Sequence, residues 1–251
     1  MALIFIMGAV VVISIIIASI YYRSSNKSVD SRVVEARQLY SEYNNYARSG
    51  NYYRIFSLLD SVESIYASYL HYTDSYERGV ILNNRAAALL TLALYRDSIR
   101  VDYNPYYNIS IDSINKIAET NLVRAITIYS DWKNRFENRS AEEIEEMIKD
   151  DFLLDFNPLS ADESARYLKS RAEEILKSIS ETDRRLSVCY TNLGVLSRQK
   201  GEYDLAVKYY REALALWDRN LSAENNLNAI FGNPPKRRNI LQRLFPPDRK
   251  D

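Results

Sequence analysis

The sequence has very little of the chemistry that most enzymes and metal sites need. Its 251 residues include one histidine, His71, and one cysteine, Cys189. A single cysteine excludes an internal disulfide, and a single histidine excludes an imidazole pair for a metal ion or a proton relay. We expect His71 to be solvated or to lie at a helix end, and Cys189 to be a buried, inert thiol. The sequence therefore predicts no cofactor, no metal and no enzymatic activity.

Glycine, proline and net charge are also scarce. Six glycines and six prolines are too few for a β-sandwich with many turns, and they provide no glycine-rich loop for phosphate. The 33 basic residues equal the 33 acidic ones, so no overall field attracts nucleic acid. Neither nucleic acid nor a small-molecule substrate is expected as a partner. With so few glycines and prolines, the rest of the chain reads as nearly continuous helix, so the sequence predicts an all-α protein.

A long apolar run is present at the start of the chain. Residues 2–20 contain no charged side chain, and a helix of this length spans about 28 Å, close to the thickness of a bilayer core. Tyr21, Tyr22 and Arg23 follow at once, as is typical of a membrane interface. We predict a single-pass transmembrane anchor over residues 1–22, with the lipid bilayer contacted through residues 2–20. A cleaved signal peptide is the alternative, but it needs a basic start and a shorter apolar core.

The charges after this segment give the predicted orientation. Residues 23–32, a juxtamembrane linker, hold three basic residues and one acidic residue. By the positive-inside rule the long C-terminal part lies in the cytoplasm, with the periplasm as the alternative.

An internal repeat lies near the end of the chain. Residues 187–220 place small and large residues at the spacing of two packed helices joined by a glycine turn, namely Tyr190, Leu193, Gly194, Gly201, Tyr203, Ala206, Tyr210 and Ala213. This run resembles the tetratricopeptide repeat, a helix–turn–helix unit of 34 residues. Gly194 and Ala206 are small where the helices are expected to cross, and Gly201 is expected to end the first helix. The resemblance implies an α-solenoid of antiparallel helix pairs over residues 33–231.

Weaker copies of the pattern occur upstream. One covers residues 39–62, with Gly50 at its turn, and another opens at Leu82. The second helix of that repeat begins about twenty residues late, which indicates a loop insertion over residues 97–113. Between residues 125 and 187 we expect helices near 140–153 and 161–180, behind the capping boxes that start at Ser140 and Ser160. These helices are either a degenerate repeat or an inserted hairpin.

Two sets of residues are candidate partner-binding sites. Some tetratricopeptide domains clamp a C-terminal carboxylate with asparagine and basic residues, and the resemblance places Asn44 and Asn84 at such positions. Tyr40, however, stands where the first basic residue is expected, so the clamp is incomplete. The second set is Tyr103, Tyr106 and Tyr107 of the insertion, because tyrosine is enriched at interfaces and this loop has no core to join. The helical tyrosines are divided between core and interface.

The tail over residues 232–251 is basic and holds four apolar residues at helical spacing. It is expected either to contact anionic lipid or a partner groove, or to fold back as a capping helix. Taken together, the sequence predicts a membrane-tethered protein–protein interaction scaffold of a membrane-associated assembly, with a bacterial envelope as one setting. The alternative is a client-handling receptor or chaperone cofactor that binds peptides in the tetratricopeptide groove.

Overall fold

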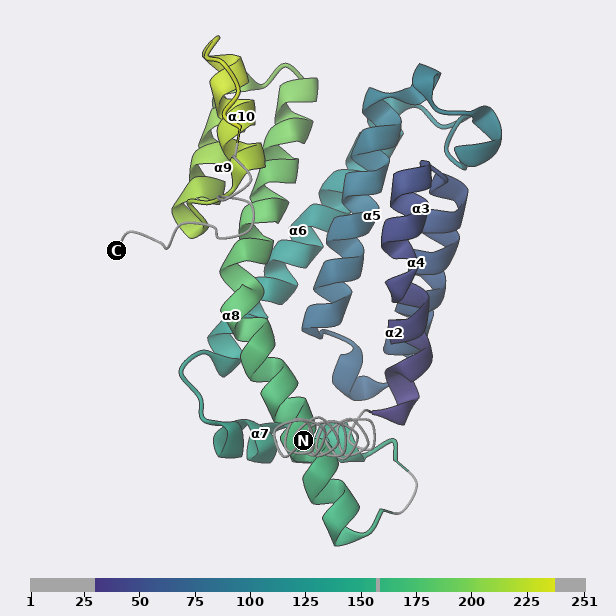
Figure 1. Ribbon diagram of the computed structural model, residues 1–251, viewed down its shortest axis with the longest axis vertical. Helices are drawn as coiled ribbons and strands as arrows, with labels where there is room; N and C mark the ends of the chain where they lie inside the picture. The colour runs from purple at the N-terminus through teal and green to yellow at the C-terminus, as the bar shows by residue number, and fades with distance from the viewer. Residues whose placement is uncertain (1–29, 157–158, 238–251) are drawn as a thin grey trace, which may run out of the picture.

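The computed structural model describes residues 30–156 and 159–237, and within these residues the regular structure is entirely helical. Figure 1 shows the helices stacked side by side, from α2–α4 through α5 and α6 to α8–α10, with α7 lying across one end. The predicted all-α class is confirmed. The principal helices are α2 (Val34–Ser41), α3 (Tyr43–Ser49), α4 (Tyr52–Ala67), α5 (Tyr76–Leu94), α6 (Ile111–Phe136), α7 (Ala141–Leu153), α8 (Ala161–Gln199), α9 (Tyr203–Leu216) and α10 (Leu221–Ile230).

The first helical hairpin turns at Gly50, as the repeat pattern predicts. Helices α2 and α3 run in one direction and α4 returns against them. Gly50 ends α3 with a φ of 66°, a left-handed conformation that favours glycine. The next residue, Asn51, caps α4 by accepting a hydrogen bond from the backbone N–H of Arg54 at 3.1 Å. The turn residues alone therefore account for the reversal.

The second hairpin, α5 and α6, is joined by residues 95–110 rather than by a short turn. This segment contains two 3-10 helices, η3 (Arg96–Ser98) and η4 (Val101–Tyr103). It overlaps the predicted insertion, but residues 111–113 belong to α6. Gly79 of α5 faces the ring of Tyr129 on α6 so closely that a Cβ at this glycine would lie 2.7 Å from the ring. The two helices can approach because this position has no side chain.

Helix α8 corrects the predicted boundaries. A helix over 161–180 and a separate first repeat helix after residue 187 were expected, but residues 161–199 form one continuous helix. Ser160 begins it with the predicted capping box, and the helix ends just before Gly201, whose φ is 78°. Within α8 the sequence has no proline and one glycine, Gly194, so nothing interrupts its hydrogen-bond ladder. The capping box at Ser140 likewise begins α7.

The third hairpin, α8 and α9, has the predicted close crossing. A Cβ at Gly194 would lie 2.5 Å from the ring of Tyr210 on α9, and Ala206 and Tyr210 are fully buried. Helix α10 then packs on both helices, and its N-cap, Asn220, bonds to α8. The Asn220 amide nitrogen lies 2.8 Å from the Ser187 hydroxyl oxygen and 2.9 Å from that of Thr191.

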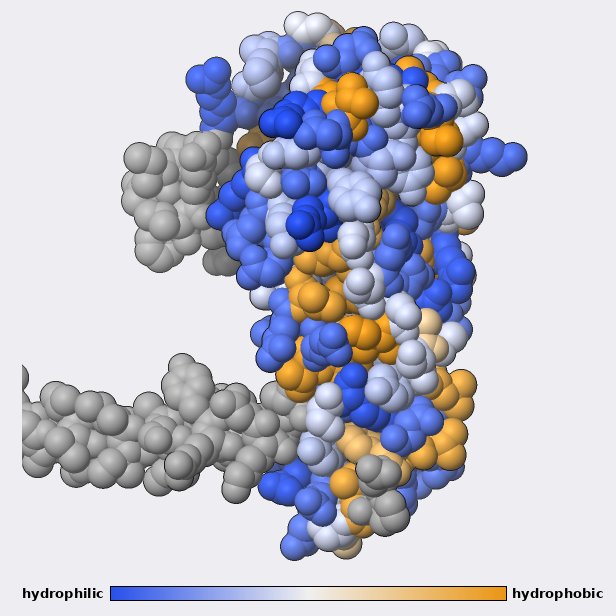
Figure 2. Space-filling view, turned by 90° about the vertical axis from the view of Figure 1, so that its right-hand side faces the viewer, coloured by the Kyte–Doolittle hydropathy of each residue, from blue (hydrophilic) through white to orange (hydrophobic). Residues whose placement is uncertain are grey.

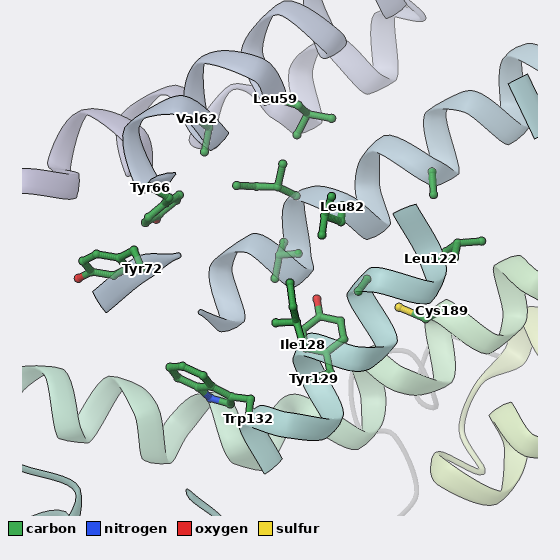
Figure 3. Close-up of a cluster of buried hydrophobic side chains, with 14 of the residues drawn as sticks. Leu59, Val62, Tyr66, Tyr72, Leu82, Leu122, Ile128, Tyr129, Trp132 and Cys189 are labelled. Atoms are coloured by element: carbon green, nitrogen blue, oxygen red, sulfur yellow. The ribbon is translucent and has the colours of Figure 1, made fainter. Parts of the chain in front are cut away.

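The core runs through most of this stack without a break. Figure 3 shows buried side chains from α4, α5, α6 and α8 directed toward a shared interior. Val62, Tyr72, Leu122 and Tyr129 are at most 1% exposed. The face seen in Figure 2 is mostly hydrophilic, with apolar residues gathered between the hydrophilic ones at mid-height. The buried tyrosines show that tyrosine serves here as a large core residue.

The predicted membrane anchor lies outside the described residues. Tyr21, Tyr22 and Arg23 fall there with it, as do residues 238–251 of the basic tail. Of the helices between residues 30 and 237, none combines the length and apolar character that crossing a bilayer requires. The described start of the tail, residues 232–237, turns back along α10, where the Lys236 backbone N–H donates to Asn225 Oδ1 at 2.7 Å.

Candidate functional site

A hollow of about 480 Å³ lies between α2, α4, α5 and α8, and we call it the central groove. Each of the three hairpins contributes its first helix to this hollow, and α4 closes it from one side. The lining residues that α8 contributes, from Glu174 to Arg185, recur every three or four positions, so they share one face of that helix. The apolar and aromatic part of the lining is Tyr40, Val62, Tyr66, Tyr76, Val80 and Ile81.

An ion network closes one end of the central groove. The guanidinium of Arg37 on α2 binds both carboxylate oxygens of Glu174 on α8, at 2.7 and 2.8 Å. Glu174 also accepts from Arg171 at 3.1 Å, and Arg171 binds Glu77 of α5 at 2.6 Å. Arg171 is only 3% exposed, so its charge requires these partners. The network therefore joins the first helices of the three hairpins.

The charges of this network are maintained across a wide pH range. Burial would raise the pKa of Glu77, but the charge and hydrogen bonds of Arg171 lower it to about 2. The guanidinium of Arg171 also lies over the ring of Tyr72, with its central carbon 4.7 Å from the ring centroid. The carboxylate and guanidinium are therefore both ionised at neutral pH, which holds this end of the groove in one arrangement.

His71 is buried beside this network, which contradicts the expectation of a solvated residue. It lies in a 3-10 helix, η2 (Leu70–Tyr72), and is 7% exposed. Arg171 Nε donates to His71 Nε2 at 3.0 Å, and His71 Nδ1 lies 3.5 Å from a carboxylate oxygen of Asp151 on α7. Burial lowers the pKa of His71, although Asp151 opposes the shift. Nε2 must accept the arginine hydrogen bond, so the neutral ring is the form that fits.

Asp151 also departs from the prediction. The acidic residues of α7 were expected to form a solvated face, but Asp151 is half-buried and faces His71. Glu142, Glu146 and Asp150 are exposed, as expected. Cys189 is fully buried, as predicted, and burial raises the pKa of its thiol to about 12.

The predicted groove residues are only partly brought together. Asn84 Nδ2 donates to the hydroxyl oxygen of Tyr40 at 2.6 Å, which orients that tyrosine at the groove wall. Asn44 is exposed on α3 and does not line the central groove. Asn192 of α8 donates to Asn83 Oδ1 of α5 at 3.0 Å. Asn84 therefore acts in helix packing, and Asn44 and Asn84 do not meet in a common site.

The insertion tyrosines have different environments. Tyr106 packs edge-on against Phe56 of α4 with ring centroids 4.9 Å apart, so this part of the loop does join the core. Tyr107 is 41% exposed. Tyr103 is half-buried under the guanidinium of Arg100, and both line a smaller hollow of about 320 Å³ beside Gly50. The expectation of a loop without core contacts is wrong for Tyr106.

Sequence reasoning missed the most prominent part of the site, the segment of α8 before the strong repeat. Arg171, Glu174 and Arg185 lie in the region where the repeat pattern lapses. Arg171 and Glu174 are three positions apart, Glu174 and Arg185 eleven, and Arg171 and Arg185 fourteen, all close to whole helical turns. This spacing indicates a shared helix face, but only if residues 161–199 are taken as one helix.

No family model matches the sequence, and neither the curated proteins nor the solved structures include a significant match. Among the residues that the structure describes, no group of three or more histidine, cysteine or acidic side chains is placed to hold a metal ion.

Proposed function

We propose that the chain is a membrane-tethered interaction module whose central groove holds a segment of a partner protein. The helix pairs are arranged in the manner of tetratricopeptide repeats, as an α-solenoid, and residues 1–22 anchor the module to a bilayer. The single observation that carries the proposal is the hollow of about 480 Å³ lined by the first helix of each hairpin. Volumes in this range are common for binding sites.

The chemistry of the lining supports binding rather than catalysis. Tyr40, Tyr66 and Tyr76 offer large rigid surfaces with polar tips, which suit a protein partner. The charged residues at the closed end bind one another, with Arg37 on Glu174 and Arg171 on Glu77. Groups held in mutual ion pairs organise the groove and are not available as acid or base.

The proposal has two forms, a dedicated scaffold and a receptor for many clients. A scaffold holds one or two partners in defined proportion at one membrane. A client-handling receptor or chaperone cofactor holds many unrelated segments, each for a short time. The lining of the groove combines apolar, aromatic and charged side chains. Such a lining favours a partner segment with a matching pattern over unfolded chains of any sequence.

Crosslinking from the groove tests the proposal. A photo-crosslinking amino acid is placed at Lys177, which is exposed at the groove rim, and as a matched control at Lys208, which is exposed on α9. Full-length protein is crosslinked in its native membrane, and the captured proteins are identified by mass spectrometry. One or two partners captured from position 177 and not from 208 support the scaffold.

Other outcomes of this experiment have distinct meanings. A long list of substoichiometric partners captured from position 177 favours the client receptor. Equal capture from both positions, or no capture from position 177, contradicts a binding role for the central groove. The side of the membrane on which the partners reside tests the predicted cytoplasmic orientation.

A further inference from the structure

The cations that line the central groove do not all have an acidic partner. Arg37 binds Glu174, and Arg184 binds Glu181 at 2.6 Å. Arg185 is half-buried, and its Nε donates to the hydroxyl oxygen of Tyr76 at 3.3 Å. Within residues 30–156 and 159–237, no carboxylate forms an ion pair with Arg185. It is thus a partly desolvated cation beside a neutral hydroxyl.

A cation in such a position favours an anionic ligand. Removing a charge from water is costly unless a counter-charge replaces the lost hydration. A guanidinium presents several N–H donors in one plane, and Tyr76 occupies only one of them. The remaining donors match a carboxylate, which forms strong charge-assisted hydrogen bonds with arginine. Lys177, about two helical turns away on the same face of α8, adds a second positive charge at the rim.

The other residues that line the groove indicate which residues should flank that carboxylate in the bound segment. Tyr40, Tyr76 and Val80 line the same groove as Arg185 and present aromatic and aliphatic surface. The α8 side of the groove extends from Glu174 to Arg185, roughly 16 Å at the rise of an α-helix. An extended chain of about five residues covers that length. A short segment of protein therefore fits the groove better than a single small molecule.

We propose that the central groove binds an extended peptide segment in which a carboxylate side chain flanked by apolar residues pairs with Arg185. This inference rests on the proposed function and names the chemistry of the partner segment. The chain's own basic tail is a poor occupant by charge, because residues 236–251 hold six basic and two acidic residues.

Peptide binding to the full chain in lipid nanodiscs tests the inference. Two fluorescein-labelled heptapeptide mixtures are compared by anisotropy, one with a fixed central Leu-Glu-Leu and one with Leu-Gln-Leu, each with randomised flanking residues. We expect the glutamate mixture to bind about tenfold more tightly, as one charge-assisted pair predicts. Arg185→Met should remove this preference, and Arg185→Lys should retain part of it.

A matched control separates the groove from the general charge of α8. Arg166 is exposed on the same helix and does not line the groove, so Arg166→Met should leave the preference for glutamate unchanged. Thermal unfolding followed by circular dichroism verifies that each variant is folded. Loss of the preference in Arg166→Met as well would overturn the assignment to Arg185.

The outcomes distinguish this inference from the proposed function. Equal binding of both mixtures, with partners still crosslinked from position 177, overturns the carboxylate pairing and leaves the interaction module intact. No binding of either mixture and no groove crosslink overturns both. A crosslink from position 177 to residues 238–251 of the same chain would make the tail the occupant, and would also overturn the inference.

Discussion

Two glycines set how closely paired helices approach in this protein. Gly79 lies against Tyr129, and Gly194 lies against Tyr210, each across a helix crossing. Both tyrosines are fully buried, and in the described structure neither hydroxyl has a hydrogen-bond partner. These two tyrosines therefore contribute through the packing of their rings. The repeat pattern predicted this role for Gly194, but Gly79 lies outside the pattern and was found only in the structure.

Replacing Gly194 with alanine should destabilise the protein, although alanine favours a helix. Helix propensity alone predicts a gain of about 1 kcal/mol. The added Cβ would lie 2.5 Å from the Tyr210 ring, however, and overpacking of this kind costs about 1–3 kcal/mol. Urea unfolding of Gly194→Ala, alone and with Tyr210→Leu, measures the effect. The two substitutions together should cost less than their sum, and a more stable Gly194→Ala would contradict the close contact.

Burial of His71 should make stability depend on pH. Its pKa is lowered in the folded protein from the ordinary value of 6.5, so the unfolded chain binds a proton more readily. The free energy of unfolding should therefore fall as the pH decreases from about 7 to about 5. The pKa of Glu77 is about 2, so the contribution of Glu77 is lost only at lower pH, below its ordinary value of 4.5.

Chemical unfolding of the wild type and of His71→Gln across this range measures the dependence. Glutamine retains an oxygen that can accept from Arg171 but does not titrate. We expect the variant to be less sensitive to pH over this interval. An equally steep dependence in His71→Gln would assign the effect to another group.

At the scale of elements, α8 is the largest difference between prediction and structure. Each capping box and glycine turn was correctly placed, because those signals are local. The continuity between residues 180 and 187 was missed, because the repeat resemblance suggested a new helix there. Helix α8 is 39 residues long and contains both the residues that line the groove and the first helix of the strong repeat pattern. It therefore connects the two ends of the stack as one continuous element.

A proline at residue 180 tests whether α8 is one helix. Ser180 is exposed in its middle, so Ser180→Ala should change stability by well under 1 kcal/mol. Ser180→Pro removes a backbone donor and clashes with the preceding turn, which costs about 3 kcal/mol in a helix interior. Thermal melts of both variants give the comparison. If proline is tolerated as well as alanine, a helix boundary lies near this residue.

At the scale of the whole molecule, the stack is not equally stable along its length. The main core runs continuously from Val33 to Leu196, whereas α9 and α10 enclose a small second cluster of Ala206, Tyr210, Ala213 and Ala223. Helix α10 has a single buried residue, Ala223. It is attached through the hydrogen bonds of Asn220 to Ser187 and Thr191 and through the half-buried side chains of Leu227 and Ile230.

Hydrogen exchange of the full chain should show this gradient. We expect amides of α9 and α10 to exchange faster than those of α5 and α6, because fewer buried contacts hold them. Asn220→Ala should accelerate exchange in α10 further, since loss of an N-cap costs about 1 kcal/mol, and leave α5 unchanged. Asn226→Ala, which removes a half-buried asparagine whose amide nitrogen donates to the Ser222 carbonyl within α10, is the matched control. Uniform protection across all helices would contradict the gradient.

The tertiary structure alone accounts for the candidate site. Arg171 and Arg185 carry no recognisable motif, and their roles depend on Glu77 and Tyr76, about one hundred residues earlier in the chain. Tyr40 and Asn84 were both singled out from the sequence, yet their mutual hydrogen bond was not foreseen. Asn44 was chosen by the same resemblance and lies elsewhere.

The sequence by itself determined the helical class, the turns at Gly50 and Gly201, the capping boxes and the Gly194 crossing, because each depends on neighbouring residues and the period of a helix. The burial of His71, the core contact of Tyr106 and the central groove were decided by tertiary structure, because each arises where helices from distant parts of the chain meet. Local sequence specifies which face of a helix is apolar. Which helix covers that face, and which charged residue is left facing a groove, depends on packing of the whole stack.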